Sequence, residues 1–192
     1  MLQSDTEVGS VGVQLKRWTR DEYRRLVEQG VLREDDRVQL IDGEIVEMPP
    51  QNPAHAGTVH LVAEALRALL RPGYSVRVQL PLALSPSSEP EPDVAVVPGA
   101  PRDYLREHPA SAVLGVEVAV ATGEFDRGRK AKVYAGAGVP EYWVVDPTAG
   151  TVDVFRDPAP GGYGSCTRLG RTDRVTPLAA PGHSIAACDL LP

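Results

Sequence analysis

Two carboxylates stand inside strand-like apolar runs of this sequence. Asp93 lies in EPDVAVV, residues 91–97, and Glu117 lies in VLGVEVAV, residues 113–120. Because an ionised carboxylate that is buried alone is strongly unfavourable, such a group is normally exposed, paired with a cation or bound to a metal. The structural explanations are an exposed strand end for Asp93 and a salt bridge for Glu117.

A third carboxylate, Glu44, directly follows a predicted hairpin turn, where a solvated side chain is the ordinary explanation. Taken together, the three acids favour a metal site, because hard divalent cations are held by carboxylate oxygens and keep several waters. Such a metal polarises a phosphoryl oxygen and activates a bound water. We therefore predict that Asp93, Glu117 and Glu44 bind Mg²⁺ or Mn²⁺.

The helix predicted after the Glu117 strand supplies cations for the same chemistry. Arg127, Lys130 and Tyr134 are spaced at i, i+3 and i+7, so they share one helix face. A phosphoryl-transfer site needs positive charge near the transition state, although basic helix residues are exposed by default. A short connection brings the first turns of this helix close to the carboxylates, which favours Lys130 as the catalytic cation.

Periodicity predicts the elements that position these residues. Capping, turn and termination signals indicate a helix, a hairpin with an Asp42-Gly43 turn and a second helix, at residues 19–30, 37–48 and 55–70. Apolar runs then predict strands at 74–84, 93–98 and 112–120, the last apolar on both faces like a central strand. A helix at about 124–138, a strand pair (PEYWVVDP and TVDVFRDP) and short strands follow. This order predicts an α/β (α+β) fold with one mixed sheet flanked by helices.

Bulk properties indicate one ordinary globular domain. The 192 residues are 42% hydrophobic and 24% charged, and we predict a flexible tail at residues 1–14 followed by a single domain at 15–192. No secretory signal or membrane-length apolar run is visible, and the two cysteines form no metal or redox motif. We therefore expect a cytoplasmic protein with buried, reduced thiols. The net charge of −6 counts against a nucleic-acid binder driven by charge alone.

Several motifs resemble a known family. LIDGEI, PPQNPAH, EPDVAVV, VEV, DRGRKAKVY and GVPEYWVVDP follow one another in the order seen in the Uma-two family of restriction endonucleases. That family belongs to the PD-(D/E)xK nuclease superfamily, and the resemblance covers about residues 17–190. It implies a restriction-endonuclease-like core, a mixed sheet flanked by helices, with a divalent metal at the open edge of the sheet.

The resemblance also implies roles for individual residues. Asp93 corresponds to the acid of the PD element, Glu117 to the second carboxylate and Glu44 to the upstream acid. The superfamily lysine, normally two residues after the second carboxylate, is absent, and a lysine on the next helix, here Lys130, takes its place. His55 matches a family histidine that would contact phosphate or assist proton transfer, unless it only packs or caps the second helix.

The function implied is a Mg²⁺- or Mn²⁺-dependent endonuclease that hydrolyses DNA phosphodiester bonds, with Arg127 and Tyr134 as further substrate-binding candidates. The alternative is a catalytically weak or inactive relative that binds nucleic acid or serves as an interaction module. It is favoured by the acidic net charge and by one departure: the family usually reads EVLSPST where this chain has EVAVATG, so Val120 and Ala121 replace a serine and a proline. A third hypothesis is an all-β binding domain. A homodimer is expected from the nuclease class alone.

Overall fold

The structure is a computed structural model that describes residues 14–33, 35–70 and 72–192. The predicted flexible tail, residues 1–14, lies outside these residues except for Gln14. The single domain predicted for residues 15–192 stays a prediction.

The first helix, α1 (Arg20–Glu28), begins with the capping box that the sequence predicts. The Thr19 hydroxyl accepts a hydrogen bond from the Glu22 backbone N–H, and the Glu22 carboxylate accepts one from the Thr19 backbone N–H. The Tyr23 hydroxyl donates to the carbonyl of Val38, which joins the helix to the following hairpin.

Strands β1 (Val38–Ile41) and β2 (Glu44–Glu47) form that hairpin in antiparallel register. Its two turn residues, Asp42 and Gly43, both have positive φ, at 50° and 75°, as a two-residue hairpin turn requires. A Cβ on Gly43 would lie 2.9 Å from the Cβ of Arg17, so the turn also needs glycine for space.

A six-stranded mixed sheet forms the centre of the fold, in the order β3-β4-β5-β6-β7-β8. Only β5 and β6 are parallel, and the other neighbours are antiparallel. The strands are β3 (Tyr74–Val78), β4 (Val94–Pro98), β5 (Leu114–Val118), β6 (Glu141–Asp146), β7 (Thr151–Ala159) and β8 (Gly162–Gly170). This architecture confirms the predicted mixed α/β fold and rules out the all-β hypothesis.

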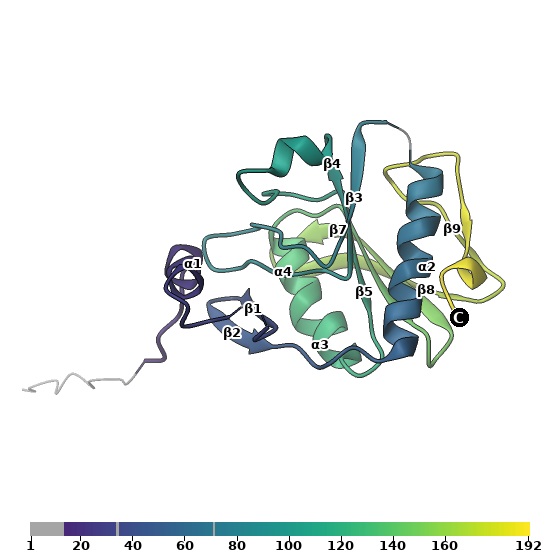
Figure 1. Ribbon diagram of the computed structural model, residues 1–192. Coiled ribbons are helices and arrows are strands. Elements are labelled where there is room, and N and C mark those ends of the chain that lie inside the picture. Colours follow the sequence, from purple (N-terminus) through teal and green to yellow (C-terminus); the bar gives the residue numbers. More distant parts are fainter. Residues whose placement is uncertain (1–13, 34, 71) are drawn as a thin grey trace, which may run out of the picture.

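Helix α2 (Pro53–Leu69) covers one face of the sheet (Figure 1). Its apolar side chains, including Val62 and Leu66, pack in one buried cluster with strand residues such as Val116 and Trp143. Two short strands and a 3₁₀ turn complete this side: β9 (Arg174–Val175), β10 (Ile185–Ala186) and η3 (Ala187–Asp189).

The parallel connection from β5 to β6 covers the other face, and α1 and the hairpin lie farther out on that side (Figure 1). It consists of α3 (Gly123–Phe125), the π-helical turn η2 (Asp126–Lys130) and α4 (Ala131–Gly136). Tyr134 of α4 packs with Tyr142 of β6 in a second buried cluster, with their ring centroids 4.7 Å apart. Since side chains alternate along β5 and Val116 and Val118 belong to the first cluster, Glu117 points to this second face.

Some expectations differ from the structure. The strand expected at 74–84 ends at Val78, and the C-terminal region contains one long strand, β8, besides its short ones. The expectation of buried thiols was wrong, because Cys166 and Cys188 are exposed. A 3₁₀ turn, η1 (Pro101–Tyr104), lies between β4 and β5. Among the residues that the structure describes, no helix has the length and apolar character needed to cross a membrane.

Candidate active site

Asp93 and Glu117 come from neighbouring strands of the sheet. In the antiparallel pair of β4 and β5, Val94 lies opposite Val116, Asp93 directly precedes β4, and Glu117 follows Val116 within β5. Both acids therefore lie at the same end of this strand pair. Both carboxylates are largely buried, with 8% of Asp93 and 3% of Glu117 exposed.

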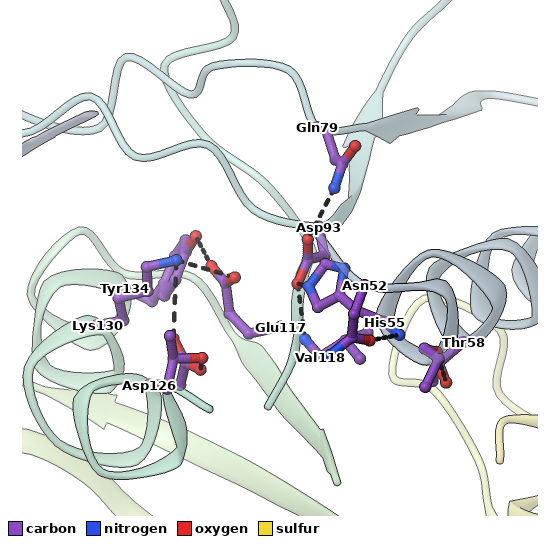
Figure 2. Close-up of polar contacts among 12 residues, drawn as sticks. Asn52, His55, Thr58, Gln79, Asp93, Glu117, Val118, Asp126, Lys130 and Tyr134 are labelled. Carbon is purple, nitrogen blue, oxygen red and sulfur yellow. Dashed lines mark hydrogen bonds and ion pairs between the residues drawn. The ribbon is translucent and has the colours of Figure 1, made fainter. Parts of the chain in front are cut away.

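Three donors fix the Asp93 carboxylate (Figure 2). Oδ2 accepts a hydrogen bond of 2.8 Å from the backbone N–H of Val118 and lies 3.1 Å from Nε2 of His55, while Oδ1 accepts one of 3.1 Å from the side-chain amide of Gln79. Burial alone would raise the pKa of Asp93, but His55, Val118 and Gln79 together lower it below its ordinary value. Asp93 is therefore a charged carboxylate in a fixed orientation.

His55 is placed by the start of α2. The Asn52 side chain caps this helix by accepting a hydrogen bond from the His55 backbone N–H. The imidazole then reaches Asp93 through Nε2, and Nδ1 is buried without a hydrogen-bond partner among the described residues. In this arrangement His55 orients a carboxylate, and its predicted contact with phosphate stays a prediction.

Glu117 is held from the opposite side by α4 and η2 (Figure 2). The Tyr134 hydroxyl donates to Oε1 over 2.9 Å, and the Lys130 ammonium lies 2.9 Å from Oε2. Burial, reinforced by the charges of Asp93 and Asp126 and opposed by Lys130, raises the pKa of Glu117 to about 8. Burial is the largest cause of this rise in pKa, so Glu117 holds its proton more readily than an ordinary glutamate.

Lys130 is a buried ammonium supplied by the π-helical turn. Only 5% of the residue is exposed, and Nζ also lies 3.7 Å from Oδ1 of Asp126, one helical turn earlier. Burial lowers the pKa of Lys130, but the charges of Glu117 and Asp126 outweigh it and raise the pKa above its usual value. The Tyr142 hydroxyl donates to the Asp126 carbonyl and anchors the turn. π-helical turns are frequent at functional sites.

These groups line one cavity of about 700 Å³ between the sheet edge and the N-terminal elements. Its lining includes a floor of Asp93, Glu117, Asp126 and Lys130; the Lys130 ammonium pairs with Glu117 and Asp126, whereas Asp93 pairs with His55. Burial raises the pKa of Asp126 against the opposing effects of Lys130 and Thr122. The floor therefore favours a further positive charge.

The structure does not bring every predicted site residue to this cavity. Glu44 pairs with Arg129 at 2.5 Å and with Arg17, outside the cavity lining. Among residues 14–33, 35–70 and 72–192, no group of three histidine, cysteine or acidic side chains is arranged to hold a metal. The predicted set of three carboxylates is therefore not assembled, because the hairpin turns Glu44 toward arginines.

Arg127 and Tyr134 were predicted to share a helix face with Lys130, but only Tyr134 does so. Arg127 instead bridges Asp153, at 2.7 Å, and Asp146, at 3.0 Å. The π-helical turn between Arg127 and Lys130 changes the residue spacing that an α-helix would give. Tyr134 is fully buried, so it supports Glu117 and cannot lie on an open substrate surface.

Sequence reasoning missed Gln79 and Asp126. Gln79 has a φ of +50°, a left-handed conformation uncommon for a residue other than glycine, which ends β3 and turns the amide toward Asp93. No local signal in the sequence announces it. Asp126 could have been found, because an acid four residues before Lys130 predicts an ion pair on a helix.

The comparisons with known proteins agree with this fold. The model of the Uma2 family, described as "Putative restriction endonuclease", matches residues 20–188. The chain belongs to the Uma2 family. A crystal structure titled as a "putative nuclease belonging to DUF820" from Anabaena variabilis shares the fold of this Uma2 protein, with a TM-score of 0.69 and 18% identity over 90% of this chain and 96% of that one. None of the curated proteins matches the Uma2 chain.

Proposed function

We propose that this protein is a divalent-metal-dependent endonuclease that hydrolyses phosphodiester bonds of DNA. The observation that carries the proposal is that Asp93, directly before β4, Glu117 of β5 and Lys130 of η2 line one cavity. The restriction-endonuclease description of the family supports the same reaction class.

The floor fits a hard divalent cation. Lys130 pairs with Glu117 and Asp126, and Asp93 pairs with His55, so the acids of the cavity outnumber its one ammonium and favour a further cation. Mg²⁺ typically takes one or two carboxylates and keeps several waters, so it does not need the third acid that Glu44 would have supplied. Asp93 and Glu117 would hold it, and the bound ion would polarise a phosphoryl oxygen and lower the pKa of a water.

Asp93 is prepared for this role by its own hydrogen bonds. A carboxylate has about four lone-pair sites, and the donors from His55, Val118 and Gln79 occupy three of them. Oδ1, which accepts only the Gln79 amide, keeps a site for a cation. Since the donors lower the pKa of Asp93, the group presents charged oxygen near neutral pH.

Lys130 would act as a fixed positive charge. Its raised pKa keeps the amine protonated, so Lys130 is unsuited to be a general base. Of the three N–H donors, one is directed to Glu117 and the looser pairing with Asp126 leaves donor capacity toward the cavity. In this position the ammonium would stabilise the negative charge that develops on the phosphoryl oxygens.

The test is a plasmid-nicking assay with Mg²⁺ or with EDTA. Wild type should nick DNA only with the metal, and Asp93→Asn and Lys130→Met should each lose about 100-fold or more of the rate. Glu64→Gln, an exposed carboxylate on α2 that pairs with Arg67, is the matched control and should cut like wild type. Equal nicking by wild type, Asp93→Asn and Lys130→Met would overturn the proposal.

A second candidate is a nucleic-acid-binding module without turnover. Val120 and Ala121 line the cavity at the positions where the sequence departs from the usual family motif, so the serine hydroxyl that would position substrate is absent at Val120. This candidate predicts salt-sensitive DNA binding without product at enzyme concentrations that exceed the DNA. Metal-dependent product from wild type that is lost in Asp93→Asn would exclude it.

A further inference from the structure

The cavity is large, although the ionisable side chains of its floor have little exposed surface. Asp93, Glu117 and Lys130 are only 8%, 3% and 5% exposed, yet all three line the same space of about 700 Å³. That volume lies within the range of roughly 300–1,000 Å³ typical of pockets that enclose a small ligand. A reacting phosphate must therefore enter a recess.

Polar side chains such as Gln51 and Gln79 line part of the recess, and apolar ones line the rest. They come from the N-terminal elements, the loop before α2 and the segment after β5, and they include Leu32, Val46, Met48, Pro49, Val120 and Phe125. Each of these side chains keeps some exposed surface. A charged phosphate group forms no favourable contact with apolar side chains, whereas the flat face of a nucleobase packs well against aromatic and aliphatic side chains.

Two arginines lie on the rim. Arg33 and Arg37 line the cavity, and neither guanidinium forms an ion pair with the carboxylates of residues 14–33, 35–70 and 72–192. The recess thus combines rim cations for a phosphate backbone, apolar walls for a base and a floor that fits a divalent cation.

We propose that this recess takes an unpaired DNA strand, with one nucleotide inserted so that its base packs against the wall at Met48 and Phe125. The inference rests on the proposed function and names the form of its substrate. Paired DNA keeps its bases stacked inside the duplex, so its phosphates would meet the rim while the apolar walls stayed empty. A nucleotide must leave the stack to enter, and this is easiest for a strand that is already single.

The charge of the floor sets a condition on binding. Glu47 and Glu91 also line the cavity, together with Asp93, Glu117 and Asp126, so without a divalent cation the interior repels a polyanion. Strand binding should therefore require the cation. Ca²⁺, which takes the same oxygen ligands, serves for the binding measurements.

The test measures fluorescence anisotropy of a labelled oligonucleotide of about 15 nucleotides, single-stranded or annealed to its complement, in Ca²⁺. The single strand should bind at least tenfold more tightly than the duplex. Phe125→Ala should weaken single-strand binding about tenfold, as loss of one stacking contact does, and leave duplex binding unchanged. Tyr74→Ala, an exposed aromatic residue on β3 outside the cavity, is the matched control. Equal or tighter duplex binding, or wild-type single-strand binding by Phe125→Ala, would overturn the inference.

A second pair of variants keeps the inference testable if Phe125→Ala folds poorly. Arg33→Gln and Arg37→Gln should each reduce the slope of log K against log salt for the single strand by about 0.7. An unchanged slope in both variants would refute the proposed contact of these arginines with the phosphate backbone.

Cleavage separates this inference from the proposed function. With Mg²⁺, cleavage of the duplex in preference to the single strand would overturn the inference and leave the endonuclease intact. If neither the duplex nor the single strand is cleaved in a metal-dependent way, the proposed endonuclease activity is refuted. The relative affinities for the two forms, measured by anisotropy, still decide whether the recess takes an unpaired strand.

Discussion

Replacing Lys130 with methionine tests the charge balance of the site without assuming any activity. The Lys130 side chain is 7% exposed, and its nitrogen lies 2.9 Å from Glu117 and 3.7 Å from Asp126. Removing one partner of a buried ion pair costs about 3–5 kcal/mol, because an uncompensated charge is left in a poorly solvated place. Methionine has nearly the same length, so packing changes little. We expect Lys130→Met to lose about 3–5 kcal/mol of unfolding free energy in EDTA.

A double-mutant cycle isolates the electrostatic part of this loss. Because Glu117 and Asp126 share one ammonium, Glu117→Gln should cost less than Lys130→Met, and the double variant should recover about 1–3 kcal/mol relative to additivity. Urea unfolding in EDTA, followed by the fluorescence of buried Trp143, measures all four proteins at constant m. A Lys130→Met protein with the wild-type urea midpoint, or strictly additive losses, would refute the shared-ammonium description.

Three further predictions concern the surroundings of the site. Burial alone would raise the pKa of Asp153, but Arg168 and Arg127 together lower it in the folded protein. The stability that this carboxylate contributes is fully present above pH about 4 and is lost as the pH falls through its lowered folded pKa. Asp153→Asn should therefore flatten this loss of stability in acid-unfolding curves. Gln79→Leu removes a donor to Asp93 and should weaken Mn²⁺ binding about tenfold in calorimetry, and wild-type affinity would show that the amide is dispensable. Glu44→Gln should leave Mn²⁺ affinity unchanged, because Glu44 lies outside the cavity lining, and a tenfold loss would restore it as a metal ligand.

The sequence predicted the framework of the site well, because local signals dominate there. The capping box at Thr19 and the Asp42-Gly43 turn depend on a few adjacent residues, and both form. Each apolar run interrupted by one acid, at Asp93 and at Glu117, became a strand or the start of one in the central sheet. The pairing of β4 with β5 then brought both acids to the same end of that strand pair.

Details that depend on non-local contacts could not be predicted. The π-helical turn separates Arg127 from Lys130, and α-helical spacing had grouped the two on one face. Glu44 follows its turn as expected, but arginines distant in sequence bind it, and no local pattern encodes those partners. The left-handed backbone at Gln79 is stabilised by its contacts with Asp93, which exist only in the folded chain.

The central claim is that Asp93, directly before β4, and Glu117, on β5, form a cation site in the cavity that the Lys130 ammonium also lines. Calorimetric titration of Mn²⁺ into wild type, Asp93→Asn and Glu64→Gln tests it most directly. We predict one binding site in wild type and in Glu64→Gln, and at least a tenfold loss of affinity in Asp93→Asn. Binding of Mn²⁺ by Asp93→Asn with the affinity of wild type would contradict the claim.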